Sequence, residues 1–106
     1  MTDTPPTAKT MDEGFYKRAD AIIDLANTQA GGVGPGPTGA SMMFAAARFN
    51  AWISATGFTS GEAMKASRQQ TLDYFLEGYR QMLEMNLDQY IVNFDAYMRP
   101  QAPNKG

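Results

Sequence analysis

Two pairs of carboxylates come nearest, in residue type and spacing, to a chemical site. Asp73 and Glu77 lie four residues apart. Glu84 and Asp88 repeat that spacing, so each pair would project from one face of a helix. Di-metal sites in helical bundles combine such carboxylates with a Glu-x-x-His motif, but the sequence contains no histidine. A solvated acidic face is the favoured interpretation, and an oxygen-only Mg²⁺ or Ca²⁺ site is the alternative. We expect no metal and no cofactor.

The sequence lacks most of the residue types and motifs that other catalytic sites use. The sequence has no cysteine, which excludes disulfides, thiolate metal sites and cysteine nucleophiles. Without histidine it also lacks the commonest general base. Residues 34–39 (GPGPTG) match the pattern G-x-G-x-x-G, but that motif follows a strand and offers backbone N–H groups, which two prolines cannot supply. We interpret this segment as a flexible linker and expect a protein that is not an enzyme.

Length and composition favour one small domain. The chain has 106 residues, 43% hydrophobic and 19% charged, with a net charge of −2. That charge and the scattered lysines and arginines argue against nucleic-acid binding. No apolar run approaches the ~20 residues of a membrane span, and the N-terminus lacks the features of a signal peptide, so we expect a cytoplasmic protein. Residues 1–9 and 100–106 are expected to be disordered tails.

One long apolar pattern dominates the C-terminal half. Its large residues recur every three or four positions and therefore share one helix face, which we call the C-terminal stripe. The stripe comprises Leu72, Leu76, Tyr79, Leu83, Leu87, Tyr90, Phe94 and Tyr97. We predict helices at about residues 11–29, 40–55 and 60–98, with a glycine/proline loop at 31–39. Whether the third helix continues through residues 65–70 is left open. The prediction is an all-α three-helix bundle spanning residues 10–99, with the stripe in its core.

The third helix is longer than the first two helices can cover. At 1.5 Å per residue it would reach about 55 Å, against about 25–30 Å for each of the others. Another copy of the chain would cover the excess, so we expect a homodimer. Tyr74, Met85 and Val92 lie roughly opposite the C-terminal stripe and form the candidate dimer face.

Two further sets of residues are candidate sites. Arg48 is the only charge on the predicted second helix, so it should be paired if it is buried. Asp20 and Asp24 are its natural partners on the first helix. With Asn27 and Asn50 these residues form a candidate inter-helix polar network. The aromatic residues Tyr16, Trp52 and Tyr79, together with Asn50, form a candidate pocket, although aromatic residues at helical spacing are more often core.

The assembled sequence resembles a small proteobacterial family, a domain of unknown function. The resemblance rests on residues 15–27 (FYKRADAIIDLAN), 45–51 (AAARFNA), 73–75 (DYF) and 86–95 (NLDQYIVNFD). It implies a helical bundle from a Gram-negative bacterium, with no assigned activity, cofactor or partner. The favoured hypothesis is a non-catalytic protein-interaction module that acts as a homodimer, with an unidentified protein as a second partner. The alternative is a helical protein that binds a small ligand between its helices.

Overall fold

The computed structural model describes residues 12–99, and in this range it contains five α-helices and no strand. The helices are α1 (Phe15–Val33), α2 (Pro35–Ala55), α3 (Gly61–Ala66), α4 (Arg68–Val92) and α5 (Phe94–Met98). The predicted all-α class is therefore confirmed. The predicted tails at residues 1–9 and 100–106, and the expected helix start at residues 10 and 11, lie outside the described residues.

The turn between α1 and α2 consists of a single residue, Gly34. It has φ 95° and ψ 161°, a region that is essentially restricted to glycine. Its N–H donates to the carbonyl of Ala30 at 2.8 Å and thereby closes α1. Pro35 and Pro37 lie in the first turn of α2, where the missing N–H groups would have no partner within the helix. The predicted loop at residues 31–39 is therefore wrong, because these prolines and glycines extend the two helices.

The predicted third helix is divided at two residues. Ser60 caps the start of α3, since its side chain accepts a hydrogen bond from the N–H of Ala63 at 3.1 Å. Ser67, with φ −102° and ψ 12°, separates α3 from α4, so the helix does not continue through residues 65–70. Asn93, with φ −109° and ψ 28°, separates α4 from α5, and its side chain donates to the carbonyl of Gln89 at 2.9 Å. Short polar side chains that bond to the backbone are typical of such breaks.

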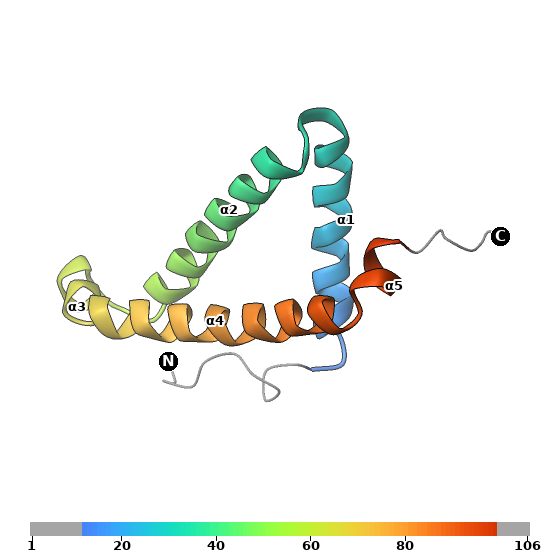
Figure 1. The fold of residues 1–106 in the computed structure, drawn as a ribbon. Coiled ribbons are helices and arrows are strands. Elements are labelled where there is room, and N and C mark those ends of the chain that lie inside the picture. The colour runs from blue at the N-terminus through green and yellow to red at the C-terminus, as the bar shows by residue number, and fades with distance from the viewer. Residues whose placement is uncertain (1–11, 100–106) are drawn as a thin grey trace.

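The three long helices form the sides of a triangle rather than a packed bundle (Figure 1). α1 and α2 diverge from the turn at Gly34, and α4 runs from the far end of α2 back toward the start of α1. The molecule measures 59 × 30 × 23 Å and has a radius of gyration of 17.2 Å. A compact domain of this length would have a radius of about 12–13 Å. The prediction of a three-helix bundle is not confirmed.

Residues 12–99 contain no buried hydrophobic side chain. The C-terminal stripe, which we expected to form the core, is 38–63% exposed at every position. Several half-buried side chains of α4 lie instead on a narrower face of the helix. They are Thr71, Tyr74, Phe75 and Met82. The physical reason is the triangle itself, since α1 and α2 meet each other near Gly34 and leave most of α4 uncovered. None of the helices described is long and apolar enough to cross a membrane.

Candidate functional site

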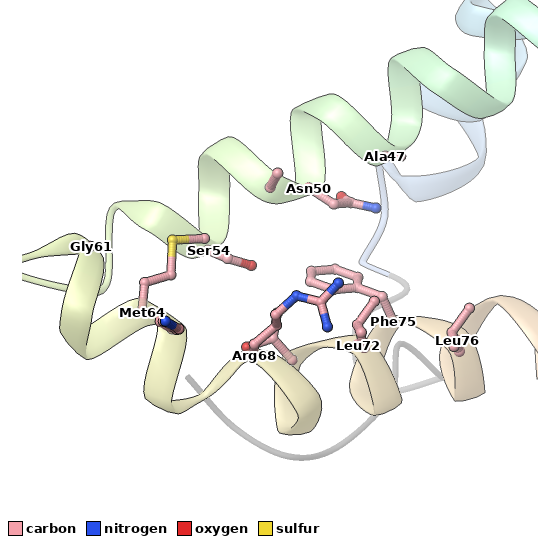
Figure 2. Close-up of a pocket in the computed structure, with 12 residues that line it drawn as sticks. Ala47, Asn50, Ser54, Gly61, Met64, Arg68, Leu72, Phe75 and Leu76 are labelled. Atoms are coloured by element: carbon pink, nitrogen blue, oxygen red, sulfur yellow. The ribbon is translucent and has the colours of Figure 1, made fainter.

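A concave site lies between α2 on one side and α3 and α4 on the other (Figure 2). Its volume is about 540 Å³, which falls within the range of ligand pockets, about 300–1,000 Å³. The lining residues are Ala47, Asn50, Ala51, Ser54, Gly61, Met64, Lys65, Arg68, Thr71, Leu72, Phe75 and Leu76. Of the residues predicted as sites, only Asn50 is among them.

Small side chains make the wall that α2 contributes. Ala47, Asn50, Ala51 and Ser54 follow the spacing i, i+3, i+4 and i+7, so they share one face of this helix. The opposite wall carries large apolar groups from α3 and α4, including Phe75. The small side chains of α2 do not fill the space that separates them from α3 and α4, and this space is the cavity.

Polar groups without partners gather in this otherwise apolar cavity. Ser54 is 3% exposed, and its hydroxyl oxygen has no hydrogen-bond partner in the described part of the chain. Lys65 and Arg68 form no ion pair with any residue between 12 and 99, and the half-buried Asn50 side chain makes no hydrogen bond there. Figure 2 shows the guanidinium of Arg68 extending into the space below α2, with the Ser54 hydroxyl directed into the same space.

The ion pairs of α4 are local and exposed. Arg80 contacts both Glu77, at 3.5 Å, and Glu84, which lies one turn further along α4. Asp73 accepts a hydrogen bond from Gln69 at 2.9 Å. The two carboxylate pairs of α4 are therefore partly engaged with neighbours on their own helix. Within residues 12–99 no group of three or more acidic or other metal-binding side chains could hold a metal ion.

An ion pair also organises the start of α1. Asp12 accepts hydrogen bonds from the backbone N–H of Gly14 at 2.9 Å and from the guanidinium of Arg18 at 3.1 Å. The hydrogen bond from Arg18 is the main cause that lowers the pKa of Asp12 below its ordinary value, and the bond from Gly14 adds to the effect. Both side chains are more than 60% exposed, so this pair organises the helix start rather than a site.

No ion pair or hydrogen bond joins the members of the predicted polar network in the described structure. Arg48 is exposed on α2, while Asp20, Asp24 and Asn27 are exposed on α1. The Thr28 hydroxyl donates to the backbone carbonyl of Asp24 at 3.2 Å, a contact within α1. Arg48 therefore does not act as a buried clamp within one chain.

The aromatic residues of the predicted pocket do not line the cavity. Tyr16, Trp52 and Tyr79 are 58%, 62% and 52% exposed. Trp52 packs against Phe49 on its own helix, with ring centres 5.7 Å apart. The sequence reasoning missed Ser54 as a site residue. The signal that could have found it is the row of small residues on α2, which marks a face that a large side chain does not fill.

The members of the candidate dimer face lie on one side of α4 but differ in exposure. Tyr74 is half-buried, Met85 is 40% exposed and Val92 is 80% exposed. The C-terminal stripe is on the other side of the helix and is exposed throughout. Two different apolar faces of α4 are thus available for contact with another molecule.

Comparisons with known proteins agree with the helical architecture. The family described as "Protein of unknown function (DUF3144)" matches residues 15–91. The solved NMR structure of the protein NB7890A from Shewanella sp. is 41% identical in sequence, with a TM-score of 0.71. The match covers 85% of this chain and 96% of that one. None of the curated proteins compared with the chain matches it.

Proposed function

Because the chain belongs to the DUF3144 family, whose function is unknown, we propose its role from its own structure: it is a non-catalytic helical interaction module that works as a homodimer. The observation that carries this proposal is that most large apolar side chains between residues 12 and 99 are exposed and none is fully buried. Soluble monomers rarely expose contiguous apolar patches larger than a few hundred Å², and larger patches mark interaction sites.

The energetics favour burial of these apolar side chains against a second copy of the chain. Hydrophobic burial is the dominant favourable term in folding, and the single chain buries no hydrophobic side chain between residues 12 and 99. Fully burying one leucine or phenylalanine side chain stabilises by about 1.5–3 kcal/mol. A few such side chains per copy would therefore supply a stability comparable to that of a typical domain, about 5–15 kcal/mol. Obligate homodimers often gain much of their stability from association with the second copy.

The C-terminal stripe is the most suitable contact surface. Its α4 part runs from Leu72 to Tyr90, about 27 Å at 1.5 Å per residue, and none of its members is polar except for the tyrosine hydroxyls. The Tyr90 and Tyr97 rings, 4.7 Å apart, extend the surface onto α5. A twofold-symmetric dimer would use this surface twice, because each copy presents the same patch to the other. The face of Tyr74, Met85 and Val92 is the second candidate surface.

The test is the oligomeric state of the full chain. Size-exclusion chromatography with light scattering, from about 1 to 100 μM, should give the mass of a dimer. Circular dichroism should show that helix content falls as the protein is diluted, since the monomer lacks a core. A monomer that keeps its helices and unfolds cooperatively at low micromolar concentration would refute the proposal.

A second candidate function is supported by a separate observation. The cavity between α2 and the α3–α4 segment combines apolar walls with unpartnered polar groups, as ligand pockets do. This function does not depend on self-association, and it is developed below.

A further inference from the structure

We propose that the cavity between α2 and the α3–α4 segment binds a small carboxylate with an apolar body, and that Arg68 and Ser54 hold the carboxylate. This inference goes beyond self-association, because it assigns a ligand class to a site that the C-terminal stripe only borders. Leu72 and Leu76 belong to both the stripe and the cavity wall.

The walls suit the apolar body of such a ligand. Met64, Leu72, Phe75 and Leu76 face α2 across the cavity, and α2 presents mainly small apolar side chains. This leaves room for a chain or a ring rather than for a bulky polar group. Transfer of each CH₂ group from water into such a site is favourable. The walls alone, however, would bind any apolar molecule, so they do not select a charge.

The polar groups select a carboxylate. Ser54 carries a hydroxyl that is buried without a hydrogen-bond partner in the described chain, an arrangement that costs free energy unless a ligand supplies an acceptor. The planar guanidinium of Arg68 presents parallel N–H donors that match the two oxygens of a carboxylate. Both groups are directed into the same space (Figure 2), and the Asn50 amide on the α2 wall is a further donor.

The charges around the cavity also favour an anionic ligand. Lys65 and Arg68 are the only charged residues of the lining, and neither has an ion-pair partner among residues 12–99. The nearest acids along the chain, Glu62 and Asp73, do not line the cavity, and Asp73 accepts a hydrogen bond from Gln69. Lys65 and Arg68 are both exposed residues that border the cavity, and two positive charges beside an apolar cavity attract an anion and repel a cation.

Three probes of equal chain length separate charge from hydrophobicity. Decanoate, decanol and decyltrimethylammonium carry the same alkyl chain with a negative, neutral or positive head. We expect isothermal titration calorimetry on the full chain to show the tightest binding for decanoate. In ¹H–¹⁵N and methyl NMR spectra, decanoate should shift the signals of Ala47, Ala51 and Ser54. Equal affinity for decanol and decanoate would overturn the proposal, because the cavity would then be only an apolar groove.

Paired variants test the residues. Arg68→Gln should weaken decanoate binding roughly ten- to a hundredfold, the usual contribution of a hydrogen bond to a charged group. Arg48→Gln is the matched control, because Arg48 is an exposed arginine without an ion pair among residues 12–99 and lies outside the cavity. It should leave the affinity unchanged. Equal losses in the two variants would refute a role for Arg68, since non-specific attraction to positive charge would explain both.

The variant Ser54→Ala tests the role of the serine hydroxyl independently of Arg68. Removing an unpartnered buried hydroxyl should raise the melting temperature of the unliganded protein and at the same time lower the affinity for decanoate. A merely structural serine would change the stability and leave the affinity unchanged, and that result would refute its role in binding.

The same samples distinguish the cavity's occupant from the dimer contact. Light scattering should show that decanoate and Arg68→Gln leave the oligomeric state unchanged. If no probe binds and Arg68→Gln instead dissociates the dimer, a second copy of the chain fills the cavity and the ligand proposal is wrong. The proposed self-association would survive that outcome, so the two proposals fail separately.

Discussion

Replacing Leu76 by alanine should weaken self-association strongly while changing an isolated chain little. The Leu76 side chain is 63% exposed in the single chain, so about two-thirds of its surface remains available for burial by a second copy. Full burial of a leucine stabilises by about 1.5–3 kcal/mol, so the remaining share contributes about 1–2 kcal/mol per copy. A symmetric dimer counts the change twice, which gives about 2–4 kcal/mol. The dimer dissociation constant should therefore rise roughly thirty- to a thousandfold.

Sedimentation equilibrium at several loading concentrations measures this constant, and circular dichroism at matched concentrations reports the helix content. Val92→Ala is the matched control, because Val92 is 80% exposed and lies on the opposite face of α4. It should shift the constant by less than about threefold, as surface substitutions generally do. If Val92→Ala weakens the dimer and Leu76→Ala does not, the contact uses the face of Tyr74, Met85 and Val92. If neither variant has an effect, the reasoning from exposed apolar surface is wrong.

Three further predictions concern the described residues. Gly34→Ala should destabilise by about 1–3 kcal/mol, because alanine does not tolerate a φ of 95° with ψ 161°; Gly31→Ala, at a helical position where an added Cβ meets nothing within 4 Å, should instead stabilise by up to about 1 kcal/mol. Chemical denaturation measures both, and a loss at Gly31 as large as that at Gly34 would contradict the backbone argument. Arg48→Ala should change the free energy of unfolding by less than about 0.5 kcal/mol, because Arg48 is exposed; a loss of several kcal/mol would show that it is buried in the assembly. The carboxyl pKa of Asp12 should lie below its ordinary value of 3.8 and return toward it in Arg18→Gln. Since the folded pKa is depressed, the pair's stabilisation is present above the unfolded pKa and is lost as the pH falls through the folded pKa, which an NMR titration of the wild type and the variant would show.

The sequence predicted some of the helical segments correctly. The three- and four-residue spacing from Leu72 onward predicted a helix, and α4 occupies that segment. The segment at residues 31–39 was misread, because prolines and glycines indicate a loop by composition alone. Their effect depends on position within the turn, and Pro35 and Pro37 occupy positions where a helix tolerates them.

The candidate site was predicted less well than the helices. Asn50 was expected both in a network with Arg48 and in a pocket with three aromatic residues. It lines the cavity, but those aromatic residues do not. Arg68 and Ser54 are fourteen residues apart in the sequence, and no local pattern connects them. They face one cavity only because the chain reverses direction between α2 and α4. Contacts of this kind depend on the angle between helices, which periodicity does not encode.

The sequence by itself determined that the chain is helical and where its largest apolar surface lies. These properties follow from propensity and from the 3.6-residue period, both of which act over a few neighbouring residues. Only the tertiary structure decided that this surface faces outward, since the single-residue turn at Gly34 and the break at Ser67 set the directions of the long helices. The triangle that results leaves the C-terminal stripe open for a second copy, and it places the unpartnered Ser54 and Arg68 side chains in one cavity.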